Sequence, residues 1–169
     1  MTDTLFFQLN DLMIHKQYII SSGLILVNYL YNNNQKDLAI ELVKRISVHD
    51  NSKLESEELN SLIQIPYDLS TFKNPKEFLS DNSKEFIKMH WEHNSHHPEH
   101  YKNFSDMTEL DIMEMVCDWY ARSKQFNTDF LSFVKKRQKN RFHFSEKQFE
   151  KIFNYCLILN QENLKNTRY

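Results

Sequence analysis

Apolar residues recur along most of this chain at spacings of three and four positions, which is the period of an amphipathic α-helix. The clearest stripe, over residues 11–31, is formed by Leu12, Ile19, Ile20, Leu24, Val27, Leu30 and Tyr31. Further helices are expected over 35–48, 53–63, 74–79 and 83–93, from residue 108 onward, over 126–136 as a separate helix or a bent continuation, and over 149–164. The pattern therefore predicts an all-α protein.

Polar residues mark the expected ends of these helices. Asn32–Asn34 would end the first one, and Asn74-Pro75 supplies an N-cap followed by proline at the first helical position. Thr108–Asp111 opens a helix with an acidic first turn, which suits the helix dipole. Ser145–Gln148 has the spacing of a capping box. Loops are expected over 66–72 and 94–107.

The composition agrees with a helical fold. A single glycine and three prolines among 169 residues leave few residues for the tight turns of a sheet. The length favours one domain, so we expect a compact single-domain helical bundle over 1–169, with a motif-bearing core at about 11–125 and C-terminal helices over 126–169. Aromatic residues such as Phe130, Phe133 and Tyr155 would line either the core or a partner surface, so a homo-oligomer stays open.

Charge and cysteine content narrow the class of protein. The formal net charge of -2 gives no strong sign of nucleic-acid binding, and the basic run Lys135–Arg141 is either a solvated helix end or a local patch that attracts anions. The longest apolar stretch, Tyr18–Leu30, is too short and too interrupted to span a bilayer, so no membrane partner is expected. Cys117 and Cys156 form no Cys-x-x-Cys motif and no signal-peptide pattern is present, so we expect reduced thiols in a cytoplasmic protein.

Five of the eight histidines lie within one window of eleven residues. They are His90, His93, His96, His97 and His100. His97 would follow His90 by two turns if their helix continued that far, and only one of His96 and His97 is expected to face an ion, because helix neighbours point about 100° apart. Imidazole suits zinc, iron, nickel and copper, and added carboxylates also suit manganese and magnesium. On density alone, a metal site and an exposed histidine cluster fit this window equally well.

Four residues outside this window are further candidate ligands. The pair His49-Asp50 offers a nitrogen and an anionic oxygen to one ion, although Asp50 would also suit the N-cap of the next helix. Asp118 lies in an apolar segment and needs a cation beside it, which is either a metal ion or Arg122 four residues on. His15, in the middle of a helix, is either a ligand or a satisfied core residue.

The order of these residues resembles the HD-domain superfamily of metal-dependent phosphohydrolases. The matching residues are His15, His49-Asp50, His90, His97 and Asp118. His49–Lys53 also fits the H-D-x-x-K form of many members, and the segments 91–100 and 114–119 look like an uncharacterised branch of small bacterial and phage HD-like proteins. The resemblance covers about 15–121 and implies a bundle of the HD-domain type. No Gly-Tyr-Pro follows the histidine pair, so the cyclic-dinucleotide hydrolysis of the HD-GYP group is not implied.

The resemblance implies a mono- or binuclear metal centre. The first ion would be held by His49, Asp50, Asp118 and His15. A second ion would share Asp50 and be held by His90 and by His97 or His96. The cofactor would be one or two divalent ions of iron, manganese, zinc, nickel or magnesium.

The implied reaction is hydrolysis of a phosphoester, with a phosphorylated small molecule or a nucleotide as substrate. Besides Asp50 as the bridge, Lys53 would contact the anionic substrate, and His93 or His100 would stabilise charge or protonate the leaving group. Three alternatives stay open. They are an HD-type di-iron oxygenase, a non-catalytic metal-stabilised protein that binds a nucleotide or a partner, and a helical protein without metal.

Overall fold

The computed structural model describes residues 3–63 and 81–166, which fold into helices and turns with no β-strand among them, so the all-α prediction is confirmed. The α-helices are α1 (Asp3–Asn32), α2 (Lys36–Val48), α3 (Ser56–Leu62), α6 (Asp81–His93), α7 (Glu109–Gln125), α8 (Phe130–Arg137) and α9 (Glu146–Asn166). Short turns of helix are η1 (Asn51–Leu54), η2 (Pro98–His100), η3 (Phe104–Asp106) and the π-helical η4 (Gln138–Phe142). The loop expected over 66–72 and the helix expected over 74–79 lie outside the described residues.

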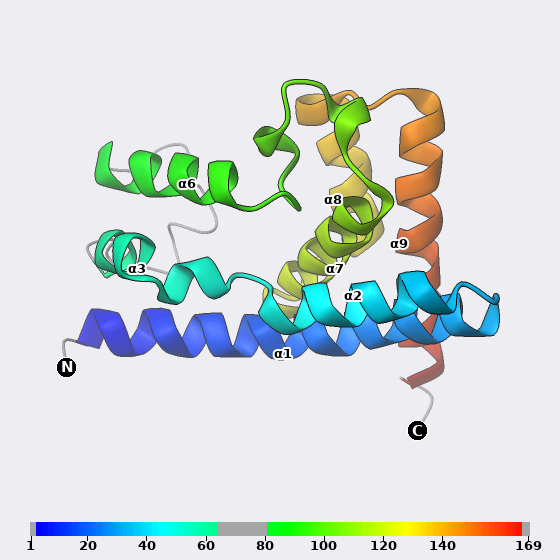
Figure 1. Cartoon of the computed structure of the whole chain (residues 1–169), viewed down its shortest axis with the longest axis horizontal. Helices are drawn as coiled ribbons and strands as arrows, with labels where there is room; N and C mark the ends of the chain where they lie inside the picture. Colours follow the sequence, from blue (N-terminus) through cyan, green and yellow to red (C-terminus); the bar gives the residue numbers. More distant parts are fainter. Residues whose placement is uncertain (1–2, 64–80, 167–169) are drawn as a thin grey trace.

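Helix α1 forms the base of the molecule (Figure 1). Helix α2 lies along its C-terminal half, and α3 lies above its N-terminal half with α6 over α3. Helices α7 and α8 rise from the middle of α1, and α9 stands near its C-terminal end. The space between α6 and α7 is bridged by the segment 94–108, which contains η2 and η3.

Several helix boundaries differ from those predicted. Helix α1 starts at Asp3 instead of residue 11. The helix expected over 53–63 is broken at Glu55, whose backbone is extended (φ -77°, ψ 150°) between η1 and α3. Helix α8 is separate from α7, because Asn127 adopts a left-handed conformation (φ 50°) after α7 has ended.

The capping box predicted at Ser145 forms only in part, whereas the helix start predicted at Thr108 carries a full capping box. Thr108 and Asp111 form a reciprocal capping box at the start of α7. At the start of α9, Ser145 Oγ accepts a hydrogen bond from the backbone N–H of Gln148 at 3.3 Å, but the Gln148 side chain donates to the carbonyl oxygen of Phe104. The second half of the predicted box is therefore replaced by a bond that ties α9 to η3.

Helices α1 and α2 approach closely at Gly23, the single glycine of the chain. A β-carbon at this position would lie 2.6 Å from Ile46 Cδ1 and 2.7 Å from Ile46 Cγ2, inside van der Waals contact. Glycine therefore lets the Ile46 side chain occupy the space beside α1, three residues before His49 at the end of α2.

Helix α7 runs through the core. Every residue from Asp111 to Ala121 is buried except Asp118, which is half-buried. The surrounding apolar side chains include Ile19, Leu26, Leu30, Leu42, Ile46, Phe130, Val134, Ile152, Tyr155, Cys156 and Leu159, with Phe133 packed against them. The aromatic residues weighed above as partner surface or core thus belong to the core. Both cysteines are free and buried.

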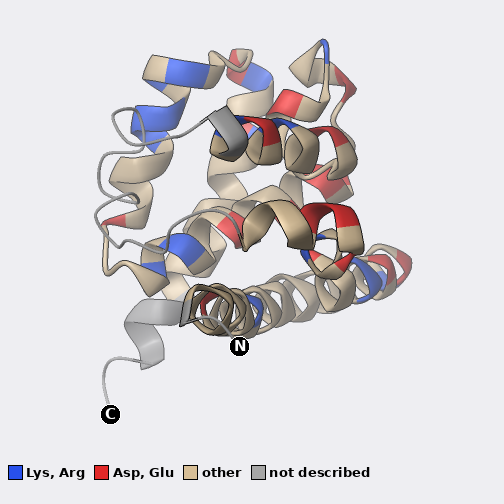
Figure 2. Cartoon of the chain, turned by 90° about the vertical axis from the view of Figure 1, so that its left-hand side faces the viewer, with Lys and Arg blue, Asp and Glu red and all other residues tan. Residues whose placement is uncertain are grey.

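Helix α1 is apolar on its outer face as well as its inner one. Its exposed large side chains are Phe6, Phe7, Met13, Ile14, Tyr18, Ile20, Leu24, Tyr29 and Tyr31. No charged side chain is exposed on α1 between residues 4 and 32, and its ribbon is mostly tan in Figure 2. Within the described residues, no helix combines the length and apolar character that crossing a membrane requires.

Candidate metal centre

The structure brings together all seven residues that the sequence analysis named as candidate ligands. His15 comes from the middle of α1, His49 and Asp50 from the turn after α2, His90 from the last turn of α6, His96 and His97 from the turn after α6, and Asp118 from α7. Five separate segments therefore meet in one cluster, which is defined here by these seven residues and called the metal cluster.

The metal cluster contains two groups of potential ligands. His15, His49 and Asp118 offer ligand atoms that all lie within 4.8 Å of one another, and the same holds for Asp50, His90, His96 and His97. One oxygen lies between the groups. Asp50 Oδ1 is 3.2 Å from His90 Nε2, 3.6 Å from His96 Nε2 and 3.6 Å from His49 Nε2. Asp50 therefore has the position of a carboxylate that can bridge two ions.

The inward-facing atoms of the metal cluster lack hydrogen-bond partners. In the described part of the chain, the buried side-chain atoms without such a partner are both ring nitrogens of His15, Nε2 of His49, His90, His96 and His97, and Oδ1 of Asp50. Buried polar groups are nearly always paired, because an unpaired one costs about 1–3 kcal/mol. This concentration of unpaired nitrogens around one carboxylate fits the donor set of a transition-metal site.

The His15–Asp118 contact also leaves a buried nitrogen without a hydrogen bond. His15 Nε2 lies 3.0 Å from Asp118 Oδ1, but this nitrogen makes no hydrogen bond. Asp118 was weighed above as an ion-pair partner of Arg122, and the structure does not form that pair. Arg122 instead donates to Asp11 Oδ2 at 3.1 Å and to Gln125 Oε1 at 2.8 Å, which leaves Asp118 with His15.

Two glutamates orient the rings of the metal cluster from behind. Glu114 Oε1 lies 2.9 Å from His49 Nδ1, and Glu58 Oε2 lies 2.9 Å from His90 Nδ1. Because a carboxylate only accepts hydrogen bonds, each Nδ1 carries a proton, and in the neutral ring each Nε2 then presents a lone pair to the cluster. Carboxylate–histidine pairs of this kind fix the tautomer and ring angle of metal-binding histidines.

Glu114 is itself held in place by an arginine. Arg45 Nε donates to Glu114 Oε2 at 2.7 Å, and Arg45 Nη2 lies 2.7 Å from Asp111 Oδ1. Asp111 also accepts hydrogen bonds from the Tyr101 hydroxyl and from Ser95 Oγ, each at 2.7 Å. This network links α2, α7 and the segment between α6 and α7, so it fixes the frame on which the metal cluster is built.

Burial and neighbouring charges favour ligand-competent protonation states for most of the cluster. Burial and Arg122 lower the pKa of His15 to about 4, and burial together with His96 holds the pKa of His97 well below its usual range. The pKa of Asp118 is lowered by His15 despite its burial. His49 is the exception, because Asp50 and Glu114 outweigh burial and raise its pKa. Neutral imidazole and ionised carboxylate are the forms that bind metals.

The backbone at Asp50 turns this side chain toward the metal cluster. Asp50 has a left-handed conformation (φ 57°, ψ 18°), which is uncommon for residues other than glycine and recurs at functional sites. Its side chain does not cap η1, so the capping role considered above is not realised. Instead, Asp50 Oδ2 accepts a hydrogen bond from Lys53 Nζ at 2.6 Å. The positive charge of Lys53, together with His49, lowers the pKa of Asp50 although burial alone would raise it.

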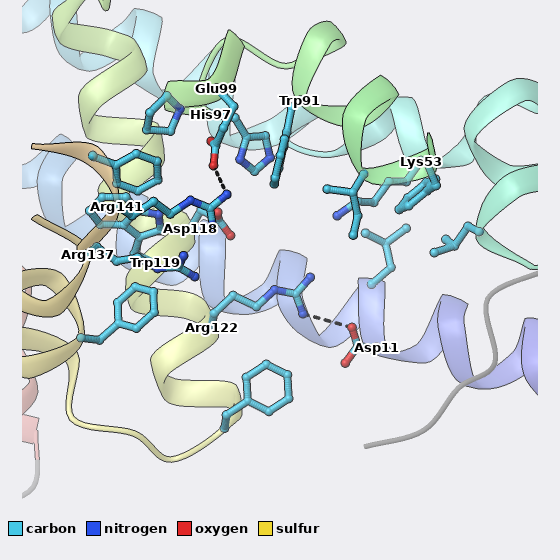
Figure 3. Close-up of a pocket in the computed structure, with 18 of the residues that line it drawn as sticks. Asp11, Lys53, Trp91, His97, Glu99, Asp118, Trp119, Arg122, Arg137 and Arg141 are labelled. Atoms are coloured by element: carbon cyan, nitrogen blue, oxygen red, sulfur yellow. Dashed lines mark hydrogen bonds and ion pairs between the residues drawn. The ribbon is translucent and has the colours of Figure 1, made fainter. Parts of the chain in front are cut away.

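The metal cluster opens onto a cavity of about 440 Å³. Lys53, His97 and Asp118 contribute to its lining from the cluster side. Figure 3 shows Arg137 and Arg141 beside Asp118, with Arg122 and Asp11 along another wall. A metal-ligand cluster at the edge of a cavity with several cations is suited to an anionic ligand.

Comparison with known proteins places the chain in a family. The sequence profile of the family DUF5662 matches residues 5–161. The chain belongs to this family, which is described as a family of unknown function. No curated protein and no solved structure matches the chain. The matched range includes the whole metal cluster and the arginines of the cavity in this DUF5662 protein.

The histidines of the window 90–100 do not all lie where they were expected. Both His96 and His97 offer a ligand atom to the second group, although only one of them was expected to face an ion. The reason is that α6 ends at His93 and both residues lie in a turn, where the angle between helix neighbours does not apply. His93 was predicted to be catalytic, but its ring is exposed and its Nδ1 lies 3.3 Å from Glu58 Oε1. His100 is exposed and contacts the carbonyl oxygen of Glu92, so neither residue lines the cavity.

Sequence reasoning missed the residues behind the ligands. Glu114 lies four positions before Asp118 on α7, and this spacing places both carboxylates on one helix face. Glu58 lies four positions before Leu62, and both are buried on one face of α3. These spacings were available in the sequence. Arg45 had no such signal, because its partners Glu114 and Asp111 come from a distant helix.

Proposed function

We propose that this protein is a metal-dependent phosphohydrolase that acts on a phosphoester of a small molecule or nucleotide through one or two ions held by the metal cluster. The observation that carries the proposal is the set of unpaired Nε2 atoms arranged around Asp50 Oδ1 at the edge of a cationic cavity. The resemblance to the HD-domain superfamily agrees with this interpretation. It rests on the motif residues and not on an overall comparison.

A bound divalent ion would supply a water of lowered pKa and polarise a phosphoryl oxygen. The chain's own residues would do the rest. His15, His49 and Asp118 would hold one ion, and Asp50 with His90, His96 and His97 would hold another. Lys53 is held against Asp50 and lines the cavity, so its ammonium group would neutralise an oxygen of the substrate's phosphoryl group. The new P–O bond forms from water, and the bond to the leaving group breaks.

The same donors would also suit two irons, so an oxygenase is the second candidate. The cationic lining of the cavity favours the hydrolase. Lys53, Arg122, Arg137 and Arg141 all contribute to this lining, and such a surface would attract the anionic phosphoryl group that a phosphohydrolase has to bind. Both free cysteines agree with a reducing compartment, and we propose the cytoplasm as the location.

The test is hydrolysis by purified protein loaded anaerobically with manganese or iron. Substrates would be p-nitrophenyl phosphate, bis-p-nitrophenyl phosphate and a set of nucleoside monophosphates. We expect phosphate or nitrophenol release by the wild type and a loss of at least 100-fold in Asp50→Ala, while Asp37→Ala, an exposed acid on α2, keeps the wild-type rate. Equal rates in both variants, or oxygen consumption without phosphate release, would contradict the proposal.

We also infer that a second copy of the chain covers the outer face of α1, which makes the protein a homodimer. Phe6, Met13, Ile20, Leu24 and Tyr31 follow the spacing of a helix–helix seam and are between 41% and 58% exposed. An aromatic side chain offers about 150–250 Å². Because these five side chains are only about half exposed, they supply only part of the roughly 800 Å² per partner that a stable interface needs, and the other exposed apolar side chains of α1 would supply the rest.

A further inference from the structure

One wall of the cavity comes from the C-terminal part of the chain, to which the sequence analysis assigned no motif. Arg137, the last residue of α8, and Arg141, in η4, both line the cavity that Asp118 and His97 also reach. The close-up in Figure 3 shows both arginine side chains next to Asp118. The basic run Lys135–Arg141, weighed above as a solvated helix end or an anion-attracting patch, therefore contributes two of its members to the cavity wall.

Arg141 is held in place by its surroundings. It forms an ion pair with Glu99, and its guanidinium carbon lies 5.1 Å from the ring centre of Trp91 and 5.1 Å from that of Phe142. Cation–π contacts of this kind, together with the carboxylate, restrict the guanidinium to one place. Arg141 is thus a positioned cation at the edge of the metal cluster.

Arg137 differs because Glu99 and Asp118 lie near it without forming an ion pair with it. It is half-buried, its guanidinium carbon lies 4.8 Å from the ring centre of Phe133, and no ion pair joins it to any acid among the described residues. Burial and the nearby charge of Arg141 lower the pKa of Arg137. Two arginines lie close together and only Arg141 forms an ion pair, so the guanidinium of Arg137 can donate hydrogen bonds to an anion that enters the cavity.

Most of the remaining lining is apolar and largely aromatic, with Gln8, Asp11 and Glu99 as polar residues among it. Leu12, Leu62, Phe86, Ile87, Trp91, Trp119, Phe126 and Phe133 contribute to it. A cavity of about 440 Å³ is at the small end of ligand pockets and is large enough for one ring system with its phosphoryl group. Aromatic walls favour a flat ligand, which can stack on them or meet them edge to face.

We propose that Arg137, with Arg141 beside it, binds the anionic group of the substrate next to the metal cluster, and that the substrate is a monoester carrying an aromatic ring. The proposal rests on the proposed function, since it names the substrate class of the same site. Arg137 is the residue that selects an anionic group with several oxygens, because its planar guanidinium donates two parallel hydrogen bonds. The aromatic wall selects the ring.

The experiment uses phosphonates, whose P–C bond is not a substrate for ester hydrolysis. Binding of phenylphosphonate and methylphosphonate to manganese-loaded full-length protein is measured by calorimetry, and the metal content is measured on the same samples. We expect phenylphosphonate to bind at least tenfold more tightly than methylphosphonate. Arg137→Gln should weaken both by at least tenfold, while Lys136→Gln, the same charge change on the exposed neighbouring residue, leaves binding unchanged. All three proteins should hold the same amount of metal.

Other outcomes overturn the inference. Equal binding by wild type and Arg137→Gln, equal loss in Lys136→Gln, or no preference for the phenyl compound would each do so. If Arg137→Gln fails to fold, Arg137→Lys keeps the charge but not the planar fork, and it must still weaken binding at least threefold with an unchanged melting temperature. Hydrolysis by the wild type with unaltered binding in the variants would refute the arginine site alone. Arginine-dependent binding without hydrolysis would refute the proposed function alone.

Discussion

Glu114 Oε1 lies 2.9 Å from His49 Nδ1, and this contact determines which nitrogen of His49 faces the metal cluster. The glutamate cannot turn away easily, because Arg45 binds its other oxygen at 2.7 Å. A histidine held in this way presents Nε2 without first having to select a tautomer, which strengthens its binding to a metal. The residue behind the ligand is therefore as much a part of the site as the ligand itself.

Replacing Glu114 by Gln should weaken metal binding without abolishing it. The amide keeps the size of the side chain but removes the charge that fixes the proton on His49 Nδ1, and losses of about 10–100-fold in metal affinity are typical for such partners. Competition with a fluorescent chelator measures the change. Glu109→Gln is the matched control, because Glu109 lies on the same helix and bonds to Tyr155 and Lys151 instead. An unchanged affinity in Glu114→Gln would show that Glu114 does not orient the ligand.

The two ligand groups predict a stoichiometry of two ions. His15→Ala removes a donor of the first group only, and His97→Ala removes a donor of the second group only. Each variant should fall from about two ions per chain to about one, whereas Asp50→Ala should lower the occupancy of both sites. Elemental analysis of dialysed protein measures this, with His143→Ala at an exposed position as control. A wild type that never exceeds one ion would reduce the centre to a mononuclear one.

Removing the metal should lower stability. The unpaired nitrogens of His49, His90 and His96 lie around Asp50 in the interior, and a bound ion would satisfy them. A ligand that binds only the folded state at 100 times its dissociation constant stabilises it by about 2.7 kcal/mol. Melting temperatures with and without a chelator should therefore differ by several degrees and recover on adding metal. The same chelator should leave the melting of Asp50→Ala nearly unchanged, and a similar drop in that variant would indicate a nonspecific effect.

Local patterns in the sequence identified the candidate ligands but few of the residues that surround them. His49-Asp50 and the histidine window are visible as short motifs, and the helices that carry them follow from apolar spacing. The pairing of His96 with His97 at one group was not predicted, because the angle between helix neighbours was applied to two residues that follow the end of the helix expected over 83–93. Nor was the place of Arg137, since it depends on how α8 packs against α7, which local patterns in the sequence do not show.

If a dimer forms through the exposed apolar face of α1, charged side chains introduced on this face should disrupt it. Ile20→Lys combined with Leu24→Lys places two ammonium groups in the middle of this face, and both positions are exposed, so the fold of the single chain should be kept. Light scattering after gel filtration should show a dimer for the wild type and a monomer for the double variant. Asn140→Lys, at an exposed position of η4, should remain a dimer. A monomeric wild type at micromolar concentration would contradict the inferred interface.

The close contact at Gly23 predicts that even a single methyl group will disturb the fold. Alanine normally stabilises a helix by about 1 kcal/mol relative to glycine. At this position its β-carbon would lie 2.6 Å and 2.7 Å from two methyl groups of Ile46, whose branched side chain has little freedom to move. Overpacking costs about 1–3 kcal/mol. We therefore expect Gly23→Ala to lower the free energy of unfolding, measured in urea, whereas Ser21→Ala at an exposed position of α1 does not lower it.

A double variant distinguishes this clash from a general intolerance of α1. Ile46→Ala removes both methyl groups that meet the new β-carbon, so Gly23→Ala should cost less in the Ile46→Ala background than in the wild type. Because Ile46 precedes His49 by three residues on α2, the shift that accommodates the clash should also reach the metal cluster. Gly23→Ala alone should weaken metal binding, and the double variant should recover part of it. Additive effects on stability would show that Gly23 and Ile46 are not coupled.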